Sequence, residues 1–353
     1  MKLLNIRRKI DKLDSEILKL LNERAGLTCN IGKIKKEKNK PVFSPDREKQ
    51  IYTRLTQHNK GPLKDETIKA IYREIMSGAL SVEKQLKIAY FGPKYTFTHI
   101  AALKKFGQSL DYIECSSISD VFTEVERGRA DYGVVPIENS TEGAVNHTLD
   151  MFIDSDVKIC SEVYLPIEHN LMSKSKKLSD IKRIFSHQQV LAQCRIWLET
   201  NLPRAELVPV TSTTVAASVY AVKKGNAAIA SKLAAEMYGL NILANSIEDS
   251  PHNITRFLVM GNQETKPTQA DKTSIVFSMK DKAGALHDVL MPFKKANINL
   301  TKIESRPSKT KAWKYYFYVD MEGHVKDRKI TNAIKQLKNH CTLLKVLGSY
   351  PMA

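Results

Sequence analysis

A short polar segment of this chain leads directly into an apolar segment. Asn253-Ile254-Thr255-Arg256-Phe257 brings an amide, a hydroxyl and a guanidinium directly before Leu258-Val259-Met260. A strand that delivers such groups to a cleft is suited to holding a carboxylate, since arginine binds that group through paired hydrogen bonds. An ordinary polar turn that leads into a strand has the same pattern. The meaning of the string therefore depends on the other motifs of the chain.

Further polar groups stand where strands end or helices begin. Val135-Pro136-Ile137-Glu138-Asn139 ends on an amide, and Ser186-His187 and Gln193 flank a strand-to-helix turn. Ser212 and Thr213 offer hydroxyls and backbone N–H groups at another helix start, which favours an anion. Ligands of α/β folds lie beyond the carboxyl ends of strands, so these positions suit substrate contacts. Each of them alone also fits a helix cap or a loop residue.

Basic residues near the amino terminus have helical spacing. Arg24 and Lys35 are 11 residues apart, which places them within about 20° on one helix face. Arg7 lies 17 residues before Arg24, about 25 Å along the axis and on a different face. Arg7 therefore cannot reach the same small ligand from its own subunit and would have to come from a partner chain. The alternative is a basic face on a solvated bundle.

Length and composition indicate a globular protein of two or three domains. The chain has 353 residues, 42% of them hydrophobic, and its apolar runs fall short of the ~20 residues of a membrane span. Arg7, Arg8 and Lys9 stand where a secretory signal would be uncharged, so we expect no export. The net charge of +17 is spread along the chain, which argues against a nucleic-acid partner and suits the steering of dianionic metabolites.

The cysteines are odd in number and lack any close pair, which argues against a disulfide framework and against a zinc site. They indicate a reduced, cytoplasmic protein. The cysteines are Cys29, Cys115, Cys160, Cys194 and Cys341.

The first part of the chain has only helical periodicity. Apolar residues recur at three- and four-residue steps from Leu3 to about Glu37, which predicts an unusually long helix. Ser44-Pro45-Asp46 predicts the cap and first turn of a second helix, and a third runs from Asp65 to Glu83. Three helices of such unequal length pack poorly in one chain, so we expect at least a dimer.

From Lys87 onward short strands alternate with helices, which predicts an α/β fold with mostly parallel sheets. The strands expected there are 88–91, 134–135, 159–163 and 227–230. A polar segment with Pro267, Gln263 to Asp271, predicts a linker. Beyond it we expect a βαββαβ unit of the ferredoxin-like type. Its expected elements are strand 272–279, helix 284–295, strands 298–306 and 312–320, helix 327–338 and strand 342–347.

In their order and spacing the polar motifs resemble those of the prephenate dehydratases, and the first eighty-odd residues resemble the all-helical chorismate mutases. Gly284 to Leu290 and Glu304 to Pro307 resemble the phenylalanine-binding segments of ACT-type regulatory domains. The resemblance implies a multidomain fold. It comprises an all-α helical chorismate mutase domain (1–85), a two-lobed α/β, periplasmic-binding-protein-like dehydratase domain (86–265) and an α+β ferredoxin-like ACT domain (270–353).

For the mutase, the resemblance implies cations around a folded dicarboxylate. It places Arg24 and partner-chain Arg7 on the carboxylates, Lys35 on the ether oxygen, Glu48 on the ring hydroxyl and Arg47 nearby. Glu83 falls where many members carry glutamine, and a glutamate must be protonated to donate to the ether oxygen. Ser44 and Ala79 replace the usual aspartate and serine, which puts the strength of the mutase in doubt.

For the dehydratase, the resemblance implies that Thr255 supplies the proton for the departing hydroxide. Tyr95 stands where the family has glycine; if that position needs positive φ, the loop is strained or shifted, and the contacts of Thr96 and Thr98 are in doubt. We treat His187 as structural. The implied substrate contacts are Thr96, Asn139, Ser186, Gln193, Ser212, Thr213, Asn253, Arg256 and Phe257.

For regulation, the resemblance implies that a helix amino terminus receives the effector carboxylate, with a glycine that leaves room for close approach. An ordinary loop glycine and strand end are the alternative. The implied effector contacts are Gly284, Ala285, Leu286, Glu304, Ser305 and Arg306.

The expected protein is thus a bifunctional enzyme of phenylalanine biosynthesis that acts on chorismate and prephenate and is inhibited by phenylalanine. We expect a homodimer or dimer of dimers, no metal or cofactor, and neither a nucleic-acid nor a membrane partner. Three alternatives remain open. They are a dehydratase with a feeble mutase, a two-lobed binding protein with an amino-acid sensor and no catalysis, and a basic nucleic-acid binder.

Overall fold

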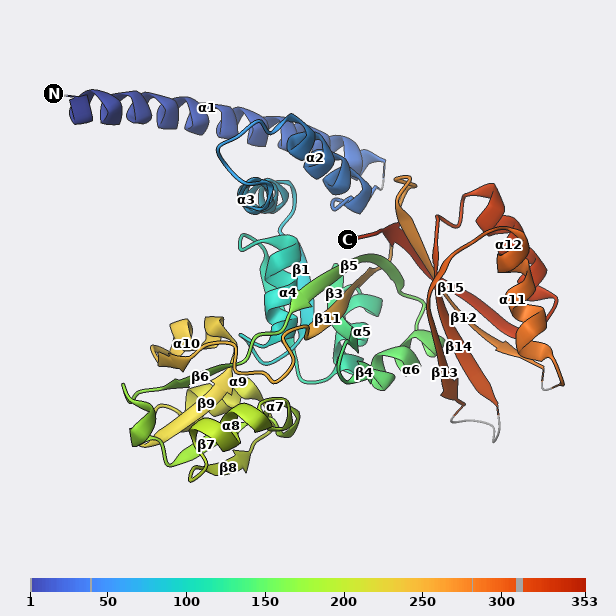
Figure 1. Ribbon diagram of the computed structural model, residues 1–353. Helices are drawn as coiled ribbons and strands as arrows, with labels where there is room; N and C mark the ends of the chain where they lie inside the picture. Colours follow the sequence, from blue (N-terminus) through green and yellow to red (C-terminus); the bar gives the residue numbers. More distant parts are fainter. Residues whose placement is uncertain (1, 39, 281, 309–313) are drawn as a thin grey trace.

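The computed structural model describes every residue except 1, 39, 281 and 309–313. A helical arm, a two-lobed body and a C-terminal sheet follow one another along the chain (Figure 1). The arm consists of α1 (Lys2–Glu37), α2 (Pro45–His58) and α3 (Asp65–Glu83), so the predicted helices are confirmed. Among the described residues, none of the helices combines the length and apolar character that crossing a membrane requires.

Helix α1 is one uninterrupted rod that projects from the body (Figure 1). Its 36 residues span about 54 Å at 1.5 Å per residue. Apolar side chains at three- and four-residue steps along it are each at least 48% exposed: Leu3, Ile6, Ile10, Leu13, Ile17 and Leu20. Apolar surface left in water costs roughly 25 cal/mol of free energy per Å², so we expect another protein surface to cover this stripe.

The first lobe holds a sheet in the order β2-β1-β3-β11-β5, with β4 beside β3. Helix α5 begins where the Ser117 hydroxyl accepts a hydrogen bond from the Asp120 N–H at 3.1 Å. The elements of this lobe are β1 (Lys87–Phe91), α4 (Phe97–Phe106), β2 (Asp111–Cys115), α5 (Ile118–Glu126), β3 (Tyr132–Asn139), β4 (Gly143–Ala144), α6 (Asn146–Asp154), β5 (Lys158–Pro166) and β11 (Ile254–Gly261).

The second lobe holds a sheet in the order β10-β6-β9-β7-β8. Ser231 caps its helix α10, and Gly239 ends that helix in the left-handed conformation at φ 58°. The elements are β6 (Asn170–Ser173), η1 (Leu178–Asp180), β7 (Arg183–Ser186), α7 (Gln188–Gln193), α8 (Arg195–Asn201), β8 (Glu206–Pro209), α9 (Thr213–Val215), η2 (Ala216–Tyr220), β9 (Asn226–Ala230), α10 (Lys232–Tyr238) and β10 (Asn241–Ala244).

The prediction of mostly parallel sheets is wrong. β1 is parallel to β2 and β3, but β11 runs antiparallel between β3 and β5, and β6 is antiparallel to both β9 and β10. The reason is that the chain leaves the first lobe after β5 and re-enters it through β11 from the opposite direction. This return places Thr255 in register between Asn139 on β3 and Leu165 on β5.

The C-terminal part is the predicted βαββαβ unit, with an antiparallel sheet in the order β13-β14-β12-β15. The predicted strand start at residue 312 lies outside the described residues. The last strand is longer than predicted because its end packs on the first lobe. The elements are β12 (Asp271–Met279), α11 (Ala285–Lys295), β13 (Leu300–Pro307), β14 (Tyr315–Glu322), α12 (Arg328–Lys338) and β15 (Cys341–Pro351).

The predicted linker is packed rather than free. The Gln263 side chain accepts from the Tyr132 hydroxyl at 3.0 Å and donates to the Phe43 carbonyl at 3.2 Å. Thr265 is buried and hydrogen-bonds the Ser349 carbonyl on β15. The segment thereby holds the arm, the first lobe and the C-terminal sheet against one another.

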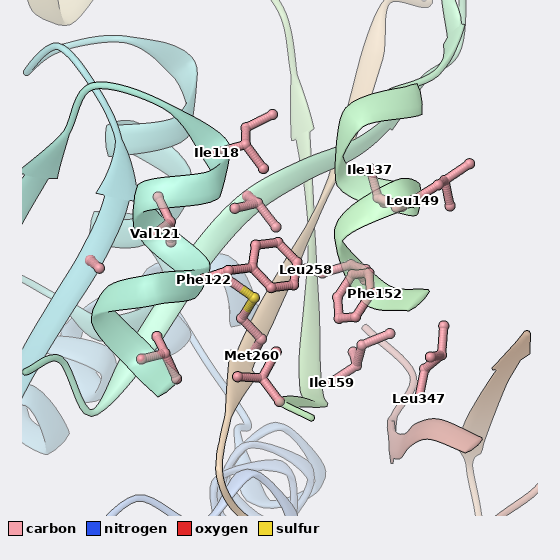
Figure 2. Close-up of a cluster of buried hydrophobic side chains, with 14 of the residues drawn as sticks. Ile118, Val121, Phe122, Ile137, Leu149, Phe152, Ile159, Leu258, Met260 and Leu347 are labelled. Atoms are coloured by element: carbon pink, nitrogen blue, oxygen red, sulfur yellow. The ribbon is translucent and has the colours of Figure 1, made fainter. Parts of the chain in front are cut away.

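Strand β15 docks on β5 through a close backbone contact. A Cβ added at Gly348 would overlap the Ile159 carbonyl oxygen and lie 2.9 Å from the Ile159 nitrogen. Beside this contact Leu347 joins the core of the first lobe, where Ile159, Phe152 and Leu258 gather (Figure 2). The hydrophobic core therefore continues from the body into the C-terminal sheet.

We predict that Gly348→Ala lowers stability by about 1–3 kcal/mol, because the methyl group has no room without a shift of either strand. Gly78→Ala in α3 is the matched control, since its Cβ would meet only Ser109 Oγ, at 4.0 Å. The control should gain about 0.5–1 kcal/mol from helix propensity. Urea unfolding of the two variants and the native chain measures both effects; a Gly348→Ala midpoint at or above the native one would contradict the docking.

Candidate active and regulatory sites

A cavity of 670 Å³ separates the two lobes. The end of β3, the start of β11 and the starts of α4, α7 and α9 open onto it. It is lined by eight of the residues predicted to contact prephenate or its leaving group: Thr96, Asn139, Gln193, Ser212, Thr213, Asn253, Thr255 and Phe257. The structure thus brings together, in one cleft, motifs that are far apart in sequence.

Thr255 sits at the first-lobe wall of this cleft and is 8% exposed. Asn139 Nδ2 donates to Thr255 Oγ1 at 2.8 Å and to Asn253 Oδ1 at 2.7 Å. Asn253 Nδ2 in turn donates to Gln193 Oε1 at 3.2 Å. The candidate acid is therefore one end of a continuous chain of hydrogen bonds that crosses between the lobes.

Tyr95 adopts φ 68°, so this loop position does require positive φ. The strained turn is held from both lobes: the Tyr95 N–H donates to His99 Nδ1 at 3.2 Å, and the Tyr95 carbonyl accepts from the Ser231 hydroxyl at 3.0 Å. Burial, then the charge of Lys94, lowers the pKa of His99 to about 4, so its ring is a neutral acceptor at neutral pH. The loop keeps Thr96 and Thr98 on the cleft wall.

Ser186 corrects one sequence-based prediction. Its side chain is fully buried, and its hydroxyl donates to the Ile229 carbonyl at 2.7 Å. This bond links the end of β7 to β9, which are parallel neighbours. Ser186 therefore shapes the second lobe behind the cleft and does not line it.

Arg256 corrects another. Successive strand residues point to opposite faces, so the residue after Thr255 faces away from the cleft. Arg256 is 5% exposed, and its guanidinium bonds Glu162 Oε2 at 2.8 Å, Asp320 Oδ2 at 2.5 Å and the Tyr350 hydroxyl at 2.9 Å. Burial opposes its charge, but Tyr350, Asp320 and Glu162 outweigh it and raise the pKa. Arg256 joins β11 to the C-terminal sheet and is not among the residues that line the cleft.

A second ion pair runs beside this one. Lys302 on β13 lies 2.9 Å from Glu138 Oε2. Glu138 is the residue directly before Asn139, and Arg256 is the residue directly after Thr255. Lys272 on β12 completes the cluster, 2.8 Å from Glu162 Oε2. Both strands that present polar groups to the cleft are thus ion-paired to the C-terminal sheet by the adjacent residue.

In the helical arm the structure pairs Lys35 with Glu83. Lys35 Nζ lies 3.0 Å from Glu83 Oε1 and donates to Oε2 at 3.3 Å and to the Val42 carbonyl at 2.5 Å. The Glu83 side chain is 2% exposed and lies against Gly32, whose added Cβ would come within 2.6 Å of Glu83 Cγ. The protonation of Glu83 stays a prediction.

The other predicted mutase residues are not gathered around that pair within one chain. Glu48 lies 2.5 Å from Lys105 Nζ on α4 of the first lobe, a partner that the sequence did not indicate. Arg47 is exposed, and Arg24 is half-buried on α1. Arg7 is 17 residues before Arg24 on the continuous rod, about 25 Å away, as predicted. A compact anion site in the arm therefore needs a further source of cations.

The C-terminal unit has a cavity of 510 Å³ at the start of α11. Gly284, at φ 76°, Ala285 and Leu286 line it together with Tyr315 and Phe317. The lining combines these apolar and aromatic groups with Lys280, Lys282 and Lys314 beside a helix amino terminus, which suits an amphipathic acid.

The second segment predicted to contact the effector, Glu304 to Arg306, lies at the same end of the sheet but outside this cavity. Ser305 pairs in register with Phe317, which lines the cavity, and Ser305 itself is exposed. Glu304 is half-buried. Arg306 donates to Asp150 on α6 at 2.8 Å, so this side chain already holds an ionic partner in the first lobe.

Sequence reasoning missed His169, which also lines the cleft. His169 is buried, and its Nε2 lies 2.8 Å from Gln193 Oε1. The available signal was its position three residues past Pro166, the end of strand β5, where functional groups of α/β folds gather. Its partner is Gln193 at the end of α7, and a contact between a loop and a helix end cannot be read from their separation in sequence.

Comparison with known proteins agrees with this division of the chain. Family profiles match for chorismate mutase type II at residues 6–84, prephenate dehydratase at 88–265 and the ACT domain at 273–339. The bifunctional chorismate mutase/prephenate dehydratase of Aquifex aeolicus is 52% identical over 352 residues, covering 99% of this chain and 97% of the relative. This chain belongs to the bifunctional chorismate mutase/prephenate dehydratase family.

Other members and structures are consistent with that assignment. The family member of Pseudomonas aeruginosa is 47% identical over 354 residues, covering 99% of this chain and 97% of its own. A solved prephenate dehydratase of Arthrobacter aurescens, in complex with L-Phe, superimposes with a TM-score of 0.69 at 35% identity. It covers 75% of this chain and 90% of that structure. As a member of the bifunctional family, the chain is an enzyme with an isomerase part and a lyase part.

We predict that the mutase rate of the native chain rises as pH falls and that Glu83→Gln makes the rate less dependent on pH. Only a protonated carboxyl donates a hydrogen bond to an ether oxygen, whereas an amide donates at every pH. Chorismate consumption by both chains across pH measures this, with dehydratase activity of the same samples as the control for folding. Identical pH profiles would refute the role of Glu83.

Proposed function

We propose that this chain rearranges chorismate to prephenate in its helical arm and converts prephenate to phenylpyruvate in the cleft between its lobes. The observation that carries the proposal is Thr255, held by Asn139 in a cleft lined by eight predicted contacts. We further propose that the functional units are 1–85, 86–265 and 270–353, and that the enzyme is cytoplasmic, as the reduced cysteines suggest.

In the arm the reaction is an intramolecular rearrangement that needs positioning and charge stabilisation rather than a nucleophile. Lys35 lies beside Glu83, so an ammonium and a carboxyl are ready for the ether oxygen. Arg24 lies on one face of α1 and supplies a cation for a carboxylate of the substrate. Arg7 of a second subunit and Arg47 complete the dicarboxylate contacts in this proposal, while Glu48 reaches the ring hydroxyl once it leaves Lys105.

In the cleft the carboxylate carbon–carbon bond breaks and its electron pair enters the ring, which expels the ring hydroxyl. Thr255 gives its proton to the departing hydroxide, so the products are carbon dioxide, water and phenylpyruvate, and Thr255 then regains a proton from solvent. An unperturbed alcohol is a weak acid, so orientation within the cleft has to compensate. Asn253, Gln193, Ser212 and Thr96 supply polar contacts for the two carboxylates of the substrate.

We also propose that phenylalanine inhibits the enzyme by binding in the C-terminal unit. The Arthrobacter aurescens relative is described in complex with L-Phe, and this chain has a cavity with apolar, aromatic and basic lining at the start of α11. Gly284 to Leu286 contribute to that cavity, and Glu304 to Arg306 lie at the same end of the sheet. In the proposed oligomer these last residues reach the effector from the neighbouring sheet edge.

The test of the proposed function is to feed purified full-length protein chorismate, then prephenate, and to follow phenylpyruvate. We expect Thr255→Ala to lose phenylpyruvate formation by a factor of about 10²–10⁴ while consuming chorismate at the native rate. The two sites lie in separate parts of the fold, so mutase activity serves as the folding control. A variant that keeps most of the native dehydratase rate would remove Thr255 as the acid.

For the effector site we predict that Gly284→Ala raises the phenylalanine concentration needed for half inhibition by roughly tenfold. An alanine at φ 76° strains the backbone by about 1–2 kcal/mol at the proposed contact. Gly128→Ala is the matched control, because Gly128 also has positive φ and open space but lies outside the C-terminal unit. Inhibition is measured relative to the uninhibited rate of each variant. Equal sensitivity of Gly284→Ala and the control would move the effector site elsewhere.

For the oligomer we predict that the mutase site is shared between subunits. Arg7→Ala and Arg24→Ala homodimers should each be inactive, since every site then lacks one cation. Their heterodimer should regain about half of the native activity, because one of its two sites combines an intact Arg24 with an intact partner Arg7. Co-expression with two affinity tags isolates the mixed dimer. Verified heterodimers without recovered chorismate mutase activity would show that Arg7 does not act across the interface.

A further inference from the structure

We propose that His169 is a positioning residue of the dehydratase. Its ring N–H holds the Gln193 amide in place and, through Asn253 and Asn139, supports the hydrogen bond at Thr255. The inference rests on the proposed dehydration of prephenate in the cleft and concerns a residue to which the family resemblance gave no role.

One end of the hydrogen-bond chain is anchored by backbone groups. Asn139 Oδ1 accepts from the N–H groups of Thr141 and Glu142, each at 3.0 Å. A backbone N–H only donates, so these contacts decide which atom of the Asn139 amide is oxygen. Asn139 Nδ2 therefore donates, to Thr255 Oγ1 and to Asn253 Oδ1.

The other end is anchored by a carboxylate. Gln193 Nε2 donates to Glu142 Oε1 at 3.0 Å, and a carboxylate only accepts. Gln193 Oε1 consequently faces the other way, where it accepts from Asn253 Nδ2 and lies 2.8 Å from His169 Nε2. Two acceptors cannot share a hydrogen bond, so His169 carries its ring proton on Nε2.

The surroundings of His169 support this tautomer. The residue is 1% exposed, and its backbone is fixed: the main-chain N–H donates to Glu248 Oε2 at 2.8 Å, and the carbonyl accepts from the Ile247 N–H at 2.8 Å. Burial lowers the pKa of His169, which keeps the ring neutral. Within the described part of the chain its Nδ1 is buried and has no hydrogen-bond partner, as expected for a ring nitrogen that carries a lone pair rather than a proton.

The location of His169 explains why this bond matters for geometry. His169 lies on the segment that joins β5 of the first lobe to β6 of the second, whereas Gln193 ends α7 in the second lobe. Thr255 and Asn139 belong to the first lobe. The bond from His169 therefore holds Gln193, the second-lobe member, in reach of the first-lobe amides, and the chain is complete only when the lobes are in register.

The chemical consequence lies at Thr255. Its oxygen accepts from Asn139, so its own proton is not used in that bond and remains available to the cleft. The same donation stabilises the oxygen as the proton leaves, because a hydrogen bond to the charged form favours that form. Correct orientation of the amide chain thus assists the proton transfer that the mechanism needs.

The test uses the full-length chain and prephenate. His169→Phe fills the space without a donor and should lower kcat for phenylpyruvate formation by up to about 100-fold with KM little changed. His169→Gln places an amide N–H near the position of Nε2 and should recover most of the rate. His147→Gln, an exposed histidine that bonds Ser119, is the control and should behave as the native chain. Chorismate consumption by the same samples reports folding.

A double-mutant cycle separates positioning from bulk structural support. If His169 acts through Gln193, then His169→Phe costs little further activity in a Gln193→Met background. Equal losses in both backgrounds would overturn the proposal, as would a native kcat in His169→Phe or no recovery in a folded His169→Gln. A native chain that forms no phenylpyruvate would instead refute the proposed function itself, before any variant is compared.

Discussion

The buried charge of Arg256 is the constraint on which the rest of the body depends. Its guanidinium is satisfied from both sides, by Glu162 within the first lobe and by Asp320 and Tyr350 from the C-terminal sheet. Removal of one partner from such a cluster typically costs about 3–5 kcal/mol, because it leaves an uncompensated charge in a low dielectric. The body and the C-terminal sheet are therefore one structural unit, although they correspond to separate families. A chain cut at the linker would lose Asp320 and Tyr350 and leave Arg256 short of partners.

This constraint reaches the cleft through the alternation of strand residues. Thr255 and Asn139 point into the cleft, and the adjacent Arg256 and Glu138 point to the C-terminal sheet, where they meet Asp320 and Lys302. A movement of β13 or β14 against the lobe therefore acts on the same two strands that hold the candidate acid and its hydrogen-bond donor. Coupling between distinct sites requires a physical element that both of them bias, and these paired strands are such an element.

The sequence predicted the elements well because they depend on local periodicity and capping. The bounds of α3 and the βαββαβ order follow directly from apolar spacing and turn residues. The antiparallel entry of β11 did not follow, since strand direction depends on where the chain returns from the second lobe. Residues such as Ser186 and Arg256 were assigned to the substrate because their types suit it. Which side chains are buried, and to which face of a strand each one points, is decided only in the folded chain. There both residues have structural partners instead.

The two proposed catalytic sites differ in what each needs from a second subunit. The cleft is assembled within one chain, because Asn139, Asn253, Gln193 and Thr255 form one hydrogen-bond chain across its two lobes. The arm differs, since Arg7 and Lys35 are 28 residues apart on one continuous helix, which separates them by about 42 Å along its axis. Its exposed apolar stripe runs past Arg7 and Arg24 along this length, so a second rod packed on the stripe would bring its own Arg7 alongside. Another copy of α1 would therefore both cover the exposed apolar stripe and supply the missing cation, Arg7.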